Sequence, residues 1–192
     1  LAFLGRISPE KGIEQAIEIA INANMLLKVA AKVDKADETY FNDRVRHLLD
    51  HPLVEYIGEI DEPAKTIFLG AARALLFPIN WEEPFGLVMI ESMACGTPVL
   101  AFRHGSVSEI VEEGASGFIV NQVTEAVEAL AQIPTLSRKR VRSIFEQRFT
   151  ASRMADDYIR LYEQAKTSNV SANSAPHFPK YVFPENDLNI IS

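Results

Sequence analysis

Short apolar runs alternate with helix-like stretches along the first 120 residues, and this alternation limits what the chain can fold into. The apolar runs occupy residues 1–4, 26–31, 54–57, 74–78, 99–102 and 117–120. They are mostly continuous rather than alternating, as strands buried on both faces of a parallel sheet are. The pattern predicts an α/β, doubly wound, Rossmann-like sheet of six mostly parallel strands with helices on both faces. Three intervening helices are expected to bury Ile13, Ala16, Ile17 and Ala20; Phe41, Val45 and Leu48; and Ala64, Ile67, Phe68 and Ala71.

The chain changes character after residue 120, where only helix-like stretches follow. These are predicted over residues 124–132, 137–147 and 151–165, the last with Met154, Tyr158, Leu161 and Tyr162 on one face. From residue 167 the composition turns to Ser, Asn and Pro without a helical or alternating period. We therefore expect one domain over residues 1–166 and an extended or poorly ordered tail over 167–192.

Composition removes several classes of function. Acidic residues outnumber basic ones by 26 to 19, and the net charge is -7. The only basic run, at residues 138–142, is expected on a solvated helix face, so no nucleic-acid partner is predicted. The single cysteine, Cys95, excludes a disulfide framework and is expected to be a small buried side chain. No apolar run approaches the ~20 residues of a membrane-spanning helix, so we expect no transmembrane segment and a cytoplasmic protein.

One predicted helix, over residues 87–95, is apolar on every face except for Glu91. A helix that is apolar all round is expected to be buried, and a buried carboxylate needs a strong hydrogen-bond donor. No basic residue lies within a helical turn of Glu91, so the hydroxyls of a ligand are a candidate donor. Glu83 lies eight residues earlier, just ahead of the helix start at Pro84, Phe85 and Gly86. The free N–H groups of this first turn suit negative or hydroxyl-bearing groups.

Charged side chains follow most of the predicted strands. Arg6, Lys32, Glu59, Glu83 and His104 all lie at the carboxyl edge of the sheet, where ligands bind in doubly wound folds.

The segment after the first strand is predicted to begin a helix, with Ser8 as N-cap and Pro9 in the first turn. This places Lys11 in the first turn, where a cation is unfavourable unless an anion lies beside it. Arg6, with its forked donors, suits the oxygens of a diphosphate.

Four motifs together resemble one family. Glu83-Pro84-Phe85-Gly86-Leu87-(x)3-Glu91 resembles the E-x7-E signature of the retaining glycosyltransferases of family 4, which have the GT-B fold. The resemblance continues through residues 93–99, Met-Ala-Cys-Gly-Thr-Pro-Val. Gly5-Arg6-(x)4-Lys11-Gly12 and Gly105-(x)3-Glu109 are also consistent with it, and the motifs stand in family order over residues 1–165.

The resemblance implies the C-terminal, nucleotide-sugar-binding half of a retaining hexosyltransferase. The acceptor would be held by an N-terminal domain of the same full-length chain. The present chain opens on a predicted strand without a methionine, so we expect a piece that is inactive alone. The full-length enzyme is compatible with membrane association. The donor would be a UDP-, GDP- or ADP-linked sugar.

The resemblance also implies roles for individual residues. Arg6 and Lys11, beside Gly5, would grip the diphosphate, Glu83 would contact hydroxyls of the transferred sugar, and Glu91 would hold the ribose hydroxyls. Catalysis would rest on Glu83, Arg6 and Lys11. Backbone amides of the helix start would face the sugar and phosphate, and these belong to Phe85, Gly86 and Leu87.

Three further positions are candidates for the site. Lys32 stands where family members often have a glycine-rich turn, and it would offer a charge to the phosphates instead. Gly105 and Ser106 would line the site through their amides, although Ser106 and Glu109 also match a helix capping box.

No D-x-D pair occurs in the chain, so no metal or other cofactor is expected, and two cations with a helix terminus would replace the metal.

Two alternatives remain on the sequence alone. One is a non-catalytic nucleotide-sugar-binding module, since fold does not establish catalysis. The other is a nucleotide-sugar epimerase of the same fold. A dinucleotide-dependent dehydrogenase is disfavoured because no G-x-G-x-x-G follows the first strand.

Overall fold

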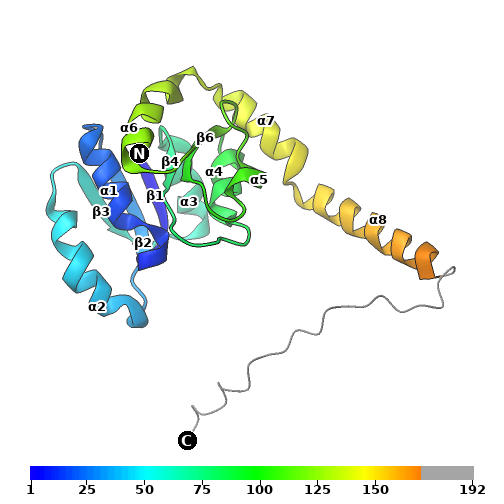
Figure 1. Ribbon diagram of the computed structural model, residues 1–192, viewed down its shortest axis with the longest axis horizontal. Helices are drawn as coiled ribbons and strands as arrows, with labels where there is room; N and C mark the ends of the chain where they lie inside the picture. Colours follow the sequence, from blue (N-terminus) through cyan, green and yellow to red (C-terminus); the bar gives the residue numbers. More distant parts are fainter. Residues whose placement is uncertain (170–192) are drawn as a thin grey trace, which may run out of the picture. The chain divides into compact units, whose positions relative to one another are not determined.

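The computed structural model describes residues 1–169 and contains one parallel sheet of six strands. The order across the sheet is β3-β2-β1-β4-β5-β6, and every neighbouring pair is parallel (Figure 1). This order confirms the doubly wound, Rossmann-like prediction, with the direction of winding reversing between β1 and β4. The strands are β1 (Ala2–Arg6), β2 (Leu27–Lys32), β3 (Val54–Gly58), β4 (Leu75–Phe77), β5 (Val99–Phe102) and β6 (Gly117–Val120).

One face of the sheet is covered by α1 (Ile13–Asn22) and α6 (Val123–Gln132), which also contact each other. The apolar stripe of α1 is buried as predicted. It packs with Phe3, Leu27 and Leu100 into one continuous core. Strands β4 and β5 are buried along their whole length, which explains why they appear in the sequence as unbroken apolar runs.

The segment after β2 winds irregularly rather than as one helix. A 3₁₀ turn (Lys35–Asp37), α2 (Glu38–Tyr40), a π-helical turn (Phe41–Val45) and a second 3₁₀ turn (Arg46–Asp50) follow one another. Val45 is buried as predicted, and Phe41 and Leu48 pack against the core from its margin.

The other face is covered by α3 (Glu62–Ala71), α4 (Leu87–Ala94), α5 (Val107–Ile110) and α7 (Arg138–Arg148), around a second core that contains Met89, Met93 and Val141. The expectation that α4 is buried on every face is wrong. Its inner face packs on this core, but Leu87 in the first turn is 63% exposed. The predicted face of α3 is also partly wrong, since Ile67 is 75% exposed and Leu69 is the buried residue.

Side-chain hydrogen bonds join the ends of α3 and α4 to α7. The Thr97 hydroxyl donates to the Leu69 carbonyl at 2.7 Å and accepts from Arg138 Nη2 at 2.7 Å. Arg138 also donates to the carbonyls of Gly70 and Ala72, both at 2.7 Å. The expectation of a purely solvated basic face at residues 138–142 is therefore wrong, because this guanidinium satisfies carbonyls at a helix C-terminus.

The chain divides into two units, Leu1–Thr150 and Ala151–Ser192. The described part of the second unit is α8 (Ala151–Asn169), which continues four residues beyond its predicted end, so residues 167–169 are helical rather than extended. The rest of the predicted tail lies outside the described residues. The apolar side chains predicted along one face of α8 are exposed. None of the helices within residues 1–169 has both the length and the apolar character needed to cross a bilayer.

Candidate functional site

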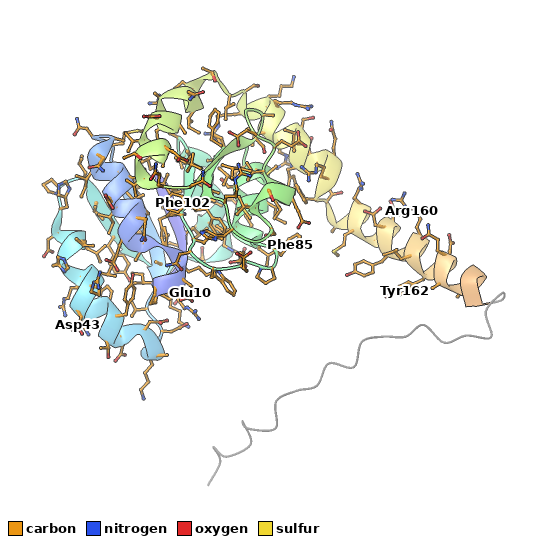
Figure 2. All side chains as sticks on the ribbon, in the orientation of Figure 1. Glu10, Asp43, Phe85, Phe102, Arg160 and Tyr162 are labelled. Carbon is orange, nitrogen blue, oxygen red and sulfur yellow. The ribbon has the colours of Figure 1, made fainter. Side chains whose placement is uncertain are left out.

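Two adjoining pockets lie at the carboxyl ends of β1 and β2, beside the start of α4. The β2 pocket, of about 420 Å³, is lined by Ala30, Lys32, Glu59, Lys65 and Glu91 among others. The loop pocket, of about 330 Å³, is lined by Lys11, Phe77, Glu83, Phe85 and Gly86 among others. Leu4, Gly5, Leu87 and Val88 line both pockets, so the two form one groove. Figure 2 labels Glu10, in the turn that follows β1, and Phe85, just ahead of α4.

Gly5 keeps the middle of the groove open, and Gly86 shapes the start of α4 beside it. A Cβ placed on Gly5 would meet no atom within 4 Å, so the absence of a side chain there leaves free space between the two pockets. Gly86 precedes α4 with φ +76, a left-handed conformation that favours glycine. The first turn of α4 lies beside the groove, where Leu87 and Val88 line both pockets. The Met89 amide donates to the Gly86 carbonyl at 3.0 Å, while the N–H groups before it are those that a helix start leaves without a partner inside the helix.

Glu83 is the acid that lines the loop pocket, and its side chain is 11% exposed. Its Oε2 accepts a hydrogen bond from Lys11 Nζ at 2.7 Å and another from Trp81 Nε1 at 3.1 Å. The same ammonium lies 4.8 Å from the centre of the Trp81 ring, which adds a cation–π contact. Within the described residues no donor reaches Oε1, so half of this carboxylate remains able to accept a hydrogen bond.

Lys11 reaches Glu83 through a turn that differs from the predicted helix start. Residues Pro9–Lys11 form a single 3₁₀ turn, and Gly12 ends it with φ +72, so α1 begins only at Ile13. A Cβ on Gly12 would lie 1.9 Å from the Pro78 carbonyl oxygen, which shows how closely this turn approaches the end of β4. The prediction that Lys11 lies in the first turn of an α-helix is therefore wrong. Lys11 instead pairs with Glu83, an acid 72 residues away.

The loop that carries Glu83 is fastened to the turn after β5. The Gly105 amide donates to Glu82 Oε2 at 2.8 Å, and the Ser106 amide donates to the Glu83 carbonyl at 2.9 Å. The Ser106 hydroxyl donates to the Phe85 carbonyl at 2.8 Å. The predicted capping box is therefore wrong, because this hydroxyl is used by the loop and does not cap α5. Gly105 and Ser106 hold the loop, and neither lines the two pockets.

Glu91 has a protein partner that the sequence did not reveal. Lys65 Nζ on α3 donates to Glu91 Oε1 at 3.0 Å, and the Glu91 side chain is 34% exposed. The expectation of a buried carboxylate is therefore wrong, and the donor to Oε1 is a lysine of another helix, whereas the sequence offered the hydroxyls of a ligand as the candidate. Glu91 still lines the β2 pocket, and no donor among residues 1–169 reaches its Oε2.

Arg6 and Lys32 lie at the rim, each beside acids. Arg6 pairs with Glu10 and also approaches Asp34 and Asp37 at 3.6 and 3.4 Å, and it lines neither pocket. The hydrogen bond with Glu10 is the main cause of a raised pKa for Arg6. Lys32 Nζ lies 2.8 Å from Asp34 Oδ1, and this contact lowers the pKa of Asp34.

A third cavity, of about 340 Å³, lies between α3, α4 and α7 and includes Thr66, Gly70, Cys95 and Arg142 in its lining. Cys95 is only partly buried, contrary to expectation, and burial is the main cause of a raised pKa for its thiol. Lys65 and Glu91 line both this cavity and the β2 pocket, so their ion pair stands between the two.

The sheet order and the groove define a doubly wound α/β domain with a groove at the carboxyl ends of the strands, where ligands bind in such folds. The chain belongs to the glycosyl transferases group 1 family, whose sequence model matches residues 1–148.

Curated relatives include D-inositol 3-phosphate glycosyltransferase 2 of Catenulispora acidiphila, 30% identical over 62% of this chain and 31% of the relative. The phosphatidyl-myo-inositol mannosyltransferase of Mycobacterium leprae is 27% identical over 71% of this chain and 38% of the relative. The chain thus spans less than half the length of these relatives.

Solved structures share the fold. AviGT4, a glycosyltransferase involved in avilamycin A biosynthesis, superposes with a TM-score of 0.72 at 26% identity, over 85% of this chain and 50% of that chain. HepE of Anabaena, solved with UDP and glucose, superposes with a TM-score of 0.72 at 21% identity, over 85% of this chain and 47% of that chain. The C-terminal domain of LpcC from Francisella tularensis superposes with a TM-score of 0.65 at 19% identity, over 78% of this chain and 85% of that chain.

Proposed function

We propose that this chain is the nucleotide-sugar-binding half of a retaining hexosyltransferase of family 4. The family assignment supports a transferase, and two relatives are named as a mannosyltransferase and an inositol-phosphate glycosyltransferase. HepE, which shares the fold, was solved with UDP and with UDP-glucose. An N-terminal domain of the full-length chain would hold the acceptor, so the present chain would bind donor but transfer no sugar alone. The location we propose is the cytoplasm, which is compatible with membrane association of the full-length enzyme.

The observation that supports the proposal best is a pair of carboxylates, each with one oxygen available to a ligand. They lie in adjoining pockets on either side of the start of α4. Glu83 and Glu91 each have one oxygen held by a lysine and one without a donor in the described part of the chain. A carboxylate oxygen of this kind accepts strongly from a hydroxyl group. In the proposal the sugar binds at Glu83 in the loop pocket, and the ribose binds at Glu91 in the β2 pocket.

The diphosphate would lie between them, over Gly5 and the first turn of α4. The amides of Phe85, Gly86 and Leu87 would donate to its oxygens, with the helix dipole adding a favourable field. Lys32 lines the β2 pocket and would bring a further positive charge, while Arg6 would have to leave Glu10 to reach the phosphates.

Transfer breaks the bond between the sugar's anomeric carbon and the phosphate oxygen, and the bonding electrons leave with the nucleoside diphosphate. Lys11, Arg6 and the helix amides would stabilise the charge that develops on this leaving group. We propose that these cationic groups make a metal ion unnecessary.

Glu83 would orient the sugar so that the acceptor oxygen attacks from the face the leaving group vacates, which retains the anomeric configuration. The acceptor proton would pass to the departing phosphate.

Calorimetric titration of the chain with UDP, GDP, ADP and their glucose or mannose conjugates tests the proposal. At least one nucleoside diphosphate should bind with a single-site isotherm, and Lys11→Met should weaken it by about 1.5–3 kcal/mol, the worth of a hydrogen bond to a charged group. Lys28→Met is the matched control, because Lys28 pairs with Glu55 at 3.0 Å and lines neither pocket. Absence of binding to all three diphosphates, or equal losses in both variants, would refute the proposed site.

A further inference from the structure

The ion pair between Lys65 and Glu91 forms one wall of the β2 pocket. Lys65 belongs to α3 and Glu91 to the second turn of α4, so the pair joins two helices. Its Nζ–Oε1 distance is 3.0 Å, and the Lys65 side chain is 19% exposed. Both residues line the pocket in which the proposed function places the nucleoside.

The position of Lys65 within α3 is unfavourable for a cation. Asp61 caps this helix by accepting a hydrogen bond from the Ala64 amide, and the Lys65 amide donates to the Asp61 carbonyl, so Lys65 lies in the first turn. The helix dipole disfavours a positive charge there, and partial burial disfavours it further. The structure compensates with two carboxylates, and hydrogen bonds to Glu62, at 2.7 Å, and then to Glu91 raise the pKa of Lys65. Lys65 is therefore charged at neutral pH.

The pair repeats the arrangement at Glu83. In both places a lysine from another part of the chain holds one carboxylate oxygen, and no donor in residues 1–169 reaches the other. A carboxylate held in this way keeps one orientation, while its second oxygen can accept a hydrogen bond from a hydroxyl. Removing the lysine would free the Glu91 side chain to rotate.

The structure assigns to Lys65 the role of a positioning residue for Glu91. Lys65 holds Oε1 so that Oε2 is presented to the ribose hydroxyls of the donor, and it acts through Glu91 rather than on the nucleotide itself. Glu62, which is 82% exposed, holds the lysine from the solvent side. This inference rests on the proposed function, because it assumes that the β2 pocket receives a ribose.

A double-mutant cycle with matched nucleotides tests the role. The probes are UDP, GDP and ADP with their 2′,3′-dideoxy counterparts, titrated calorimetrically into the chain, and the base that binds wild type best is carried forward. Lys65→Met should weaken the ribonucleotide about tenfold, within the range for coupled neighbours, and leave the dideoxynucleotide unchanged. In a Glu91→Gln background Lys65→Met should have no further effect. Lys65→Arg should recover most of the affinity, and Lys28→Met should match wild type.

Three results would overturn the inference. Equal losses for ribo- and dideoxynucleotide would show that Lys65 contacts the base or phosphate, or only supports the fold. If Lys65→Met binds the ribonucleotide as tightly as wild type while Glu91→Gln loses affinity for the ribonucleotide alone, Lys65 does not position Glu91. The proposed function would then still hold. Failure of wild type to bind any of the three diphosphates would refute the proposed function and the inference with it.

If circular dichroism shows that Lys65→Met does not fold, the Glu62→Gln variant replaces it in the titrations. A ribose-specific loss of about twofold is then expected, and the absence of any ribose-specific loss contradicts the role.

Discussion

Gly105→Ala should displace the loop that carries Glu83. Gly105 has φ +50, and a Cβ there would lie 2.3 Å from the Glu83 carbonyl oxygen and 2.5 Å from its amide nitrogen. Both are backbone atoms, so no side-chain rotation can relieve the contact and the loop itself must move. That movement would break the hydrogen bonds from Gly105 to Glu82 and from Ser106 to Glu83.

The expected cost has two parts. A left-handed conformation costs a non-glycine residue roughly 1–2 kcal/mol, and two lost hydrogen bonds add about 1 kcal/mol each. Gly105→Ala should therefore lower the free energy of unfolding by about 3–4 kcal/mol. Gly114→Ala is the matched control, because Gly114 has φ +70 but open space within 4 Å, so only the roughly 1–2 kcal/mol conformational term applies.

Urea unfolding of the two variants and wild type measures this difference. Calorimetry with a nucleoside diphosphate and its sugar conjugate adds a functional measurement. Displacement of Glu83 should lower the affinity for the sugar conjugate more than the affinity for the diphosphate. If Gly105→Ala costs no more than Gly114→Ala, or if it leaves the sugar conjugate's affinity unchanged, the argument that this turn positions Glu83 is refuted.

Three further changes have defined expectations in urea unfolding. Lys11→Met should cost roughly 1–3 kcal/mol, because it leaves the enclosed Glu83 carboxylate with only the Trp81 donor; unchanged stability would contradict the pairing. Arg138→Met should cost roughly 2–4 kcal/mol by leaving carbonyls at the ends of α3 and α4 unpaired, whereas the exposed Arg140→Met should be nearly neutral. Thr97→Val should cost about 1–3 kcal/mol, since it removes a buried hydroxyl that donates to Leu69 and accepts from Arg138, and a neutral result would show that these bonds add nothing.

The middle of the sheet was predictable because β4 and β5 are buried along their whole length. Burial demands apolar residues throughout a strand, and strands β5 and β6 begin and end where the apolar runs do. The stripe of α1 was predictable for the same reason. Helix α4 was not, because its first turn lies at the mouth of the groove, and nothing in an apolar composition distinguishes an exposed leucine there from a buried one.

The site was predictable only as far as local spacing reaches. Glu83, Gly86 and Glu91 lie within one loop and helix, so their proximity follows from helix geometry. Lys65, the partner of Glu91, lies 26 residues away on α3, and Lys11 lies 72 residues from Glu83. Such pairings depend on how the helices and strands pack in three dimensions. The hydrophobic periodicity of the sequence does not show which distant residues will pair.

The turn at Lys11 shows the same limit. Ser8 and Pro9 suit a helix start, but Gly12 has a left-handed backbone and lies too close to Pro78 to carry a side chain, and the α-helix begins only after it.

Amide chemical-shift mapping tests the central claim most directly. The ¹⁵N-labelled chain of 21.4 kDa would be titrated with the nucleoside diphosphate that binds best. We predict that the largest saturable shifts fall on Gly5, Lys32 and the start of α4 at Phe85, Gly86 and Leu87. Shifts concentrated instead at Thr66, Gly70 and Cys95, around the cavity between α3, α4 and α7, or no shifts at millimolar ligand, would contradict a donor site in the groove.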